Sequence, residues 1–505
     1  MKECVVAMDQ GSSSSRALAF DSRGGILAQS RSPVATRRKN DLRAEQDAEE
    51  ILNSQSLALR RTLSALGDPR RVRGIGLAAQ RSTVVFWDKD SGRPVCPALS
   101  WQDGRAAQIC DGHREHLESV FEKTGLVLNP YYSACKMQWV LRHVPRARRL
   151  LERGRLLAGP VSSYLVWHLT RGEVFGVDPS MAQRTLLFNI HTLDWDEFLL
   201  SLFGIPRSIL PPVRLSGGAW GEFRERGVRI PILCTLGDQQ GAVLGARCLS
   251  PGQALLSHGT GAFLLLNTGA ELCRVPGLLT SVGWSVSRGL SAAAPGSSAA
   301  GAMRACYLLE GTVHAVAPGY QWLGRNFGWL KDNGEVDGLC RRSKRRVWVL
   351  NALGGLGAPR WDYRVPTQFY GLGPETVSAD IVRGATECIG FLIADIAARM
   401  SESGQKIATL SAAGGISRVD YLLQFEADLL QREVVRPPEA ELTALGAAHL
   451  AAQAAGLPFD SGGALKRARR FRPKISGDEA RALHGRWRRF VEGARALSER
   501  MESGL

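Results

Sequence analysis

The stretch MKECVVAMDQGSSSSRALAFDSRGGILAQS (1–30) carries the strongest fold signal in the chain. Residues 3–9 and 16–21 predict two strands joined by a tight turn of glycine and serines, and a glycine pair leads to a third strand over 26–30. The first turn offers backbone N–H groups and hydroxyls that can hold a phosphate, and Arg16 adds a neutralising charge. An ordinary serine-rich hairpin explains the pattern equally well.

The segments after this hairpin predict helices and strands in alternation. A helix is expected over 48–66, with Asp47 as its N-cap and Gly67 as its C-cap. Residues 71–80 predict a strand, and 82–88 are interpreted as its hairpin partner. Further helices are expected over 133–144, 160–169 and 194–203.

A second segment of the same kind begins near residue 250. GQALLSHGTGAFLLLNTG (252–269) is again a strand, a glycine turn and a returning strand. KIATLSAAGG (406–415) predicts a strand that ends at a glycine pair, and a helix is expected over 419–431. Small residues over 446–456 predict a helix that packs closely. Two such copies indicate a duplicated α/β fold.

This duplication sets the expected domain organisation. We expect an N-terminal domain over 1–248 and a C-terminal domain over 249–505, with a ligand-binding cleft between them. The 505 residues are 44% hydrophobic and 22% charged, which excludes disordered, collagen-like and disulfide-scaffold proteins. No window approaches 18 consecutive apolar residues, and the apolar run before Asp9 is too short for a signal peptide. We therefore expect a cytoplasmic protein that does not insert into membranes.

Cysteine usage and charge narrow the classes of partner. The 10 cysteines are scattered without a CxxC pair, which favours reduced thiols over structural zinc. The net charge of +16 is concentrated in basic runs over 341–346 and 466–490. These runs are typical of solvated helix faces or loops, so we expect no nucleic-acid partner.

Three later motifs complete the chemical pattern. GDQQGAVLG (237–245) places an acid between a strand and a helix, although an N-cap aspartate is an equally ordinary interpretation. HGTGAF (258–263) and AAGG (412–415) are further glycine turns at strand ends. Asp9, at the end of the first strand, is suited to hold Mg²⁺ through water. P-loop, HExxH and strand-linked GxGxxG motifs are absent from the sequence.

Taken in order, these blocks resemble the FGGY family of carbohydrate kinases over residues 4–490. AMDQGSSSSRALAFD (7–21) resembles the first phosphate motif of that family, and TGLVLNPYYSACKMQWVL (124–141) its first signature. Residues 181–213 are most similar to the glycerol kinase subgroup. GDQQ, GTGAF, GLGAPRWD (355–362) and TALGAAHLA (443–451) follow in family order.

The resemblance implies an actin- and hexokinase-like (ribonuclease H-like) fold of two duplicated domains that close on ATP, Mg²⁺ and a small polyol or sugar. It implies that Asp238 is the catalytic base and that Asp9 organises the metal. The residues implied to bind nucleotide are Ser12, Ser13, Ser14, Arg16, Thr260, Gln321 and Gly415. Those implied to bind the acceptor are Arg81, Ser82, Trp101, Asp103, Tyr131, Asp238, Gln239 and Phe263. A homodimer or homotetramer is also in keeping with the family.

Some positions depart from the family pattern. Ser82 stands where glycerol kinases carry a glutamate that binds two substrate hydroxyls, and Asp103 lies in a motif closer to that of pentulose kinases. Ala317 and Val419 replace family residues near the nucleotide. Phosphorylation of glycerol to glycerol 3-phosphate is the first hypothesis. A kinase of another acceptor, such as a pentulose or tetritol, and a non-catalytic nucleotide or sugar sensor remain as alternatives.

Overall fold

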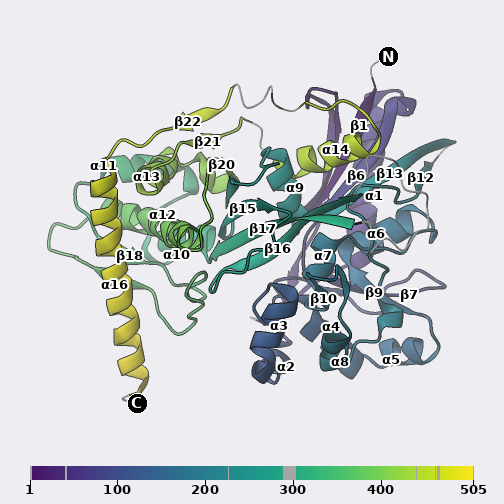
Figure 1. The fold of residues 1–505 in the computed structure, drawn as a ribbon, viewed down its shortest axis with the longest axis horizontal. Coiled ribbons are helices and arrows are strands. Elements are labelled where there is room, and N and C mark those ends of the chain that lie inside the picture. Colours follow the sequence, from purple (N-terminus) through teal and green to yellow (C-terminus); the bar gives the residue numbers. More distant parts are fainter. Residues whose placement is uncertain are drawn as a thin grey trace.

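A computed structural model of the chain describes residues 3–39, 42–225, 227–287, 303–438, 441–460, 462 and 467–503. Figure 1 shows two bodies, with the N-terminal half in purple and blue on the right and most of the C-terminal half in green and yellow on the left. Each body is built around its own mixed sheet. The duplicated α/β fold that the sequence predicts is therefore confirmed.

The first sheet has the order β12-β13-β6-β1-β2-β3. β1, β2 and β3 are antiparallel neighbours, whereas β1, β6 and β13 run parallel. Its strands are β1 (Cys4–Gln10), β2 (Ser14–Phe20), β3 (Ile26–Pro33), β6 (Val72–Ala79), β12 (Glu222–Glu225) and β13 (Val228–Gly237).

The second sheet repeats this topology, in the order β16-β17-β15-β14-β20-β21-β22. Here β14, β15 and β17 form the antiparallel meander, and β14, β20 and β21 run parallel. Its strands are β14 (Gln253–His258), β15 (Ala262–Gly269), β16 (Leu279–Ser287), β17 (Met303–Val313), β20 (Thr409–Ala413), β21 (Val434–Arg436) and β22 (Arg469–Phe471).

One predicted strand pairing is wrong. Residues 84–88 form β7 (Val84–Asp88), which does not pair with β6 but joins a separate sheet with the order β4-β5-β8-β7-β9. β7 pairs along its whole length with β9 (Leu156–Pro160). Alternation identified the strand but carried no information about its partner. The remaining strands outside the two main sheets are β4 (Arg37–Arg38), β5 (Ala44–Gln46), β8 (Ala98–Leu99), β10 (Phe188–Asn189), β11 (Asp194–Trp195), β18 (Trp348–Leu350) and β19 (Gln368–Tyr370).

The helices of the N-terminal half agree closely with the pattern. α1 spans Ala48–Leu66, its N-cap Asp47 accepts hydrogen bonds from two backbone N–H groups, and Gly67 ends it with a positive φ. The other helices of this half are α2 (Ala107–Asp111), α3 (Leu117–Thr124), α4 (Ser133–His143), α5 (Pro145–Glu152), α6 (Val161–Leu169), α7 (Pro179–Gln183), α8 (Glu197–Phe203) and α9 (Asp238–Gly245).

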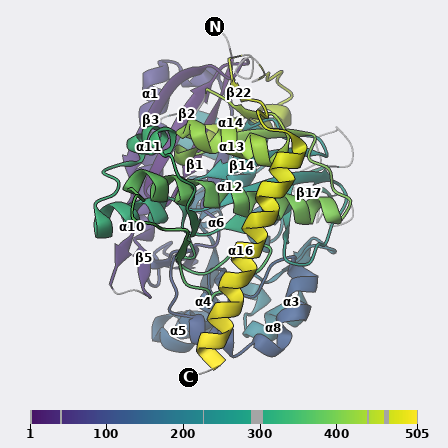
Figure 2. The ribbon, with the colours of Figure 1, turned by 90° about the vertical axis from the view of Figure 1, so that its left-hand side faces the viewer.

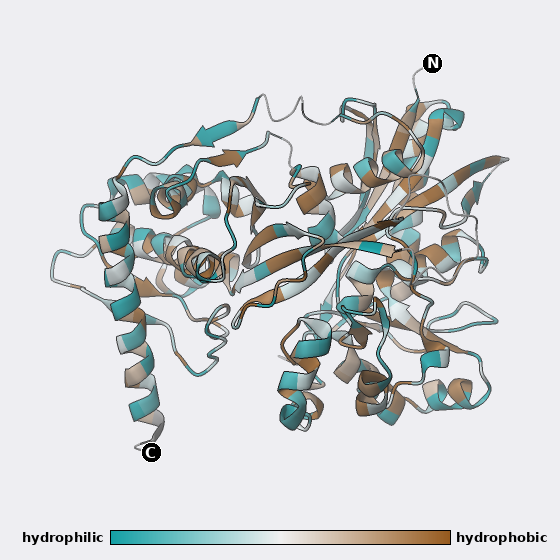
Figure 3. Cartoon of the chain, viewed as in Figure 1, coloured by the Kyte–Doolittle hydropathy of each residue, from teal (hydrophilic) through white to brown (hydrophobic). Residues whose placement is uncertain are grey.

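The C-terminal half carries the longest helices. In Figure 2, α16 crosses the outer face of this half in front of α12 and α13. Figure 3 shows that the central strands are largely hydrophobic, whereas α16 presents many hydrophilic residues. The helices are α10 (Val316–Phe327), α11 (Val336–Arg342), α12 (Ser378–Glu402), α13 (Asp420–Leu430), α14 (Leu442–Ala454) and α16 (Gly477–Ser503). Among the described helices, none is long and apolar enough to span a bilayer.

Helix α14 joins the two halves. It belongs to the C-terminal half in sequence, yet it packs on α9 and on β1, β6 and β13 of the first sheet. A Cβ added at Gly446 would collide with the carbonyl oxygen of Gly241, and one at Gly76 with that of Ala447. Small residues are therefore required at this crossing, as the sequence predicts. The predicted boundary at 248/249 falls between α9 and β14 and stays a prediction.

Candidate active site

The candidate catalytic residues follow three parallel strands at one edge of the first sheet. The register pairs Gln10 with Ala79 and Ala79 with Gly237, so β1, β6 and β13 end side by side. Asp238 follows β13 directly, and Arg81 is the second residue after β6. The carboxyl ends of parallel strands are a common place for ligands in α/β folds.

A cavity of about 470 Å³ lies beside these strand ends and is walled by both halves of the chain. Eight of the predicted site residues line it: Ser12, Arg81, Trp101, Tyr131, Asp238, Gln239, Thr260 and Phe263. The aromatic rings of Trp101 and Tyr131 pack against each other, with centroids 5.4 Å apart. A wall of this kind, apolar with a few charged groups, suits a small polyhydroxylated ligand.

Asp238 is the carboxylate of the cavity. Its side chain is 36% exposed there, and its Oδ1 accepts a hydrogen bond of 2.8 Å from the backbone N–H of Gln239. Arg81 Nε lies 3.4 Å from the same oxygen. Desolvation raises the pKa of Asp238, and Arg81 opposes that rise. A partly desolvated carboxylate of this kind can accept a proton from a substrate hydroxyl.

The first glycine-serine turn connects β1 and β2 as predicted. Trp101 donates its indole N–H to Ser12 Oγ at 2.8 Å, which places this serine on the cavity wall. Ser13 is exposed and Ser14 is buried as the first residue of β2. Of the three serines, Ser12 lines the cavity, whereas Ser13 and Ser14 do not.

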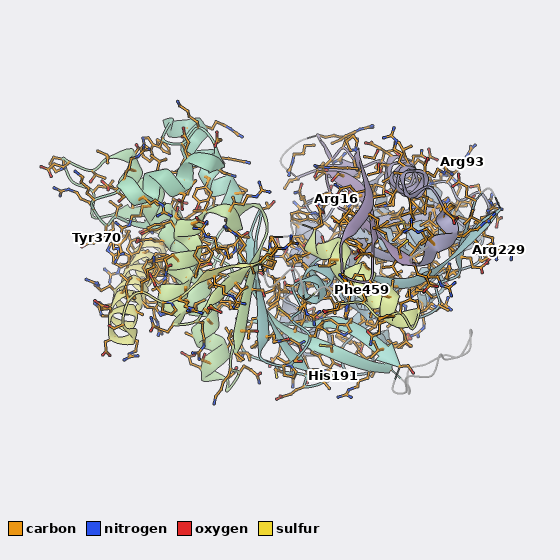
Figure 4. All side chains as sticks on the ribbon, turned by 90° about the horizontal axis from the view of Figure 1, so that it is seen from above. Arg16, Arg93, His191, Arg229, Tyr370 and Phe459 are labelled. Carbon is orange, nitrogen blue, oxygen red and sulfur yellow. The ribbon has the colours of Figure 1, made fainter. Side chains whose placement is uncertain are left out.

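Arg16 lies close to two acidic groups. It forms ion pairs with Asp9, at 2.7 Å, and with Glu441, which precedes α14. Its Nε is buried without a hydrogen-bond partner. Figure 4 shows Arg16 on the N-terminal half, at the side that faces the other body. Burial raises the pKa of Asp9 to about 6, Arg16 opposes that rise, and the carboxylates of Asp238 and Glu441 add to it.

The second glycine turn lies across the cavity from the first. Thr260 is at its tip, and the parallel register of Ser257 with Ala413 places the Gly414-Gly415 turn beside it. Gln321, on α10, lines a separate cavity of about 440 Å³ in the C-terminal half. Gly415 lines neither of these two cavities. Of these three predicted nucleotide ligands, Thr260 therefore shares the cavity with Asp238, whereas Gln321 and Gly415 do not.

Two predicted acceptor ligands do not reach the cavity. The Asp103 carboxylate is buried and accepts hydrogen bonds from the Arg105 guanidinium and from the backbone N–H of Ala44. Its hydrogen-bonding capacity is therefore used within the protein. Ser82 has φ 62°, its side chain is buried, and its Oγ has no partner. It is not part of the cavity lining.

The structure adds two charged residues that the sequence pattern did not single out. Arg184 and Glu310 both line the cavity and form a buried ion pair of 2.5 Å. Burial alone would raise the pKa of Glu310, but Arg184 and Arg81 lower it to about 2, so this carboxylate stays ionised. The signal that could have revealed Glu310 is a single charge within the otherwise apolar strand YLLEGTV (307–313).

The donor set near Asp9 fits a divalent cation. Asp238 and Glu441 disfavour the ionised form of Asp9, and Asp9 Oδ2 is buried without a hydrogen bond despite its ion pair. Mg²⁺ prefers one or two carboxylates and keeps several waters. The described residues contain no compact group of three or more His, Cys, Asp or Glu ligands, so an all-protein cage is not indicated.

Comparison with known proteins gives the family. Residues 4–245 match the N-terminal domain of the FGGY family of carbohydrate kinases. Residues 254–455 match the C-terminal domain of the same family. The chain therefore belongs to the FGGY family of carbohydrate kinases.

The individual relatives cover almost the whole chain. A glycerol kinase from Nitratidesulfovibrio vulgaris is 39% identical, and the match covers 99% of this chain and 100% of that protein. A glycerol kinase from Thermus brockianus is also 39% identical, and the match covers 97% of this chain and 98% of that protein. A crystal structure of Plasmodium falciparum glycerol kinase with ADP is similar with a TM-score of 0.88 and 26% identity, covering 98% of both chains. A gluconate kinase from Lactobacillus acidophilus, at 19% identity and a TM-score of 0.84 over 99% of both chains, shares the fold.

Proposed function

We propose that this chain transfers the γ-phosphate of ATP to a terminal hydroxyl of glycerol, forming glycerol 3-phosphate. The observation that carries the proposal is the position of Asp238. It lies in a cavity between two phosphate-sized turns and is held by Arg81. Curated relatives of 39% identity that are named glycerol kinases support glycerol as the acceptor.

The residues divide into an acceptor side and a phosphate side. Asp238 accepts the proton of the attacking hydroxyl and aims its oxygen, while Arg81 and Gln239 hold the other hydroxyls. Trp101, Tyr131 and Phe263 cover the carbon chain of the acceptor. Phosphoryl transfer needs alignment and charge neutralisation more than covalent chemistry by the protein.

On the phosphate side, the turn with Ser12, Ser13 and Ser14 and the turn with Thr260 bind the nucleotide phosphates from opposite halves. Arg16, which pairs with Asp9 and Glu441, adds positive charge there. Gln321 and Gly415 lie along the rest of the nucleotide. Asp9 would hold Mg²⁺, and the bound ion would supply neutralisation of the phosphate charge.

Glycerol is favoured over the other acceptors considered from the sequence. Ser82 and Asp103 are the two positions whose sequence favours a longer sugar. The Asp103 carboxylate is occupied by Arg105 and Ala44, and Ser82 does not line the cavity. Asp238, Arg81 and both turns are in place, which argues against a non-catalytic sensor. We further propose a cytoplasmic enzyme, where ATP is available, and a homodimer or homotetramer, which light scattering on the purified protein would test.

The test is ADP release by purified protein with Mg²⁺ and ATP against glycerol, dihydroxyacetone, erythritol, xylitol, xylulose, ribulose and gluconate. We expect a clear preference for glycerol, and loss of about 10²–10⁴-fold in kcat for Asp238→Asn, which removes the base. Preference for a longer acceptor would contradict the proposal that glycerol is the substrate. ADP release that persists in Asp238→Asn would contradict the role of the base.

A further inference from the structure

A fully buried lysine lies directly behind the acceptor wall. Lys136, on α4, has no exposed surface and is not part of the cavity lining. Its ammonium donates to the carbonyl oxygens of Ser82, Ser100 and Tyr131, at 3.0, 2.9 and 2.7 Å. All three protons of the ammonium group are used in this way. A lysine is seldom completely buried, so its presence here calls for a specific reason.

Each of these carbonyl groups belongs to the backbone of the acceptor wall. Ser82 is bonded to Arg81, Ser100 is bonded to Trp101, and Tyr131 is itself a wall residue. The three segments are distant in sequence and belong to three different connections of the fold. The ammonium is one point at which all three are held together.

The backbone at Ser82 shows what this contact achieves. Ser82 adopts a positive φ of 62°, which a residue with a side chain rarely does without outside support. Its carbonyl oxygen accepts from Lys136 and also from the Ser133 hydroxyl, at 3.2 Å. Its own hydroxyl has no partner, so the support comes through the backbone. The neighbouring residue, Arg81, has its Nε 3.4 Å from Asp238 Oδ1.

We propose that the Lys136 ammonium is a positioning group for the acceptor, because it joins the three backbone segments that carry the acceptor-binding side chains. The inference rests on the proposed function for the identity of the acceptor. Lys136 does not touch the reacting atoms. Its effect is on where Arg81, Trp101 and Tyr131 stand before the acceptor arrives.

The electrostatic setting supports this role. Burial lowers the pKa of Lys136 to about 7, and the nearby Asp103 carboxylate opposes that shift. Asp103 and Arg105 form an ion pair with each other and do not line the cavity. Asp103 therefore contributes to the acceptor site indirectly, by favouring the charged form of the lysine.

The test compares Lys136→Met with wild type and with Lys123→Met. Lys123, on α3, forms an ion pair with Asp196 and is outside the cavity, so it controls for loss of a lysine charge. For Lys136→Met we expect KM for glycerol to rise at least about tenfold, with kcat and KM for ATP changed less than about threefold. Lys123→Met should leave all three constants unchanged. A folded Lys136→Met enzyme with wild-type KM for glycerol would overturn the proposal. An equal rise in KM for glycerol and in KM for ATP would also overturn it.

A milder variant covers the case in which Lys136→Met does not fold. Ser133→Ala removes one of the two donors to the Ser82 carbonyl and keeps the ammonium. We expect a rise of about two- to fivefold in KM for glycerol with KM for ATP unchanged, and no rise would overturn the proposal. If wild type prefers another acceptor of the panel, the proposed function fails and the comparison proceeds with that acceptor. A wild-type protein that turns over no acceptor would contradict both the proposed function and the positioning role of Lys136.

Discussion

Arg81 stands between two carboxylates: its Nε is 3.4 Å from Asp238 Oδ1, and its Nη1 is 3.7 Å from Glu310 Oε2. Glu310 is in turn paired with Arg184. The floor of the cavity is thus a chain of alternating charges that runs from the proposed base into the C-terminal half. Arg81 lines the cavity and its Nη1 is buried without a hydrogen-bond partner, so we expect Nη1 to donate to a hydroxyl of the bound acceptor.

Replacing Arg81 by lysine tests this bridging role. Lysine keeps the positive charge but has no planar fork that reaches two carboxylates and a hydroxyl at once. We expect kcat/KM for glycerol to fall by about 10- to 100-fold, with KM for ATP little changed. Steady-state kinetics with each substrate varied measures both constants. Arg60→Lys, in a surface pair with Glu225, is the matched control and should behave as wild type.

Ser82 offers a gain-of-function test. A glutamate at this position would add a charged hydrogen-bond acceptor near Arg81, and the backbone already has the conformation that Lys136 supports. We expect Ser82→Glu to lower KM for glycerol about tenfold. Ser82→Ala should leave KM unchanged, because the Ser82 hydroxyl has no partner to lose. A KM for glycerol that rises in Ser82→Glu would show that the pocket has adapted to the serine.

Local signals in the sequence predicted much of this fold. α1 could be predicted to the residue because its caps, Asp47 and Gly67, lie within the segment itself. The duplicated hairpins were visible because strand alternation and glycine turns are also local. The pairing of β7 with β9 could not be predicted, because β9 lies about 70 residues further along the chain and only tertiary packing selects it.

Residues of the candidate site were predictable near the ends of strands. Asp238 follows β13 directly, Thr260 is the second residue after β14, and both line the cavity. Asp103 was misjudged because nothing in its motif reveals that Arg105, two residues later, folds back onto its carboxylate. Glu310 was missed because a charge within an apolar strand is informative only when its partner, Arg184, is known.

Asp103 should matter more for stability than for acceptor choice. Its carboxylate and that of Glu45 neutralise the buried Arg105 guanidinium. Removing one partner leaves a buried charge poorly compensated, so we expect Asp103→Ala to cost about 3 kcal/mol or more of folding free energy. Thermal unfolding measures this loss. The ratio of glycerol to xylulose turnover should stay as in wild type, and a shift towards xylulose would restore Asp103 as a direct ligand.

The crossing of α14 and α9 can be tested through its glycines. A methyl group at Gly446 would collide with the Gly241 carbonyl, so the helices must separate. We expect Gly446→Ala to destabilise the protein by about 1–3 kcal/mol. Gly485→Ala is the control, because Gly485 is on α16 with open space around it and alanine favours helix. Its melting temperature should equal or exceed that of wild type.

The raised pKa of Asp9 predicts that Mg²⁺ binding depends on pH. Its pKa is raised to about 6, so the carboxylate gains a proton and loses its charge as the pH falls through that value. Only the ionised form attracts Mg²⁺, and we therefore expect kcat/KM for ATP to decline below about pH 6. Proton and metal compete for the same oxygens. Raising Mg²⁺ from about 1 to about 20 mM should move this decline to lower pH.

Two variants separate this effect from general acid inactivation. The side chain in Asp9→Asn cannot titrate. The decline of its residual activity at low pH should therefore no longer move when the Mg²⁺ concentration is raised. Asp21→Asn, at the far end of the same hairpin, removes a carboxylate outside the cavity and should keep the wild-type profile. An acid limb that stays at the same pH at both magnesium concentrations would show that Asp9 does not hold the metal. The decline would then be assigned to Asp238, whose pKa is also raised by desolvation.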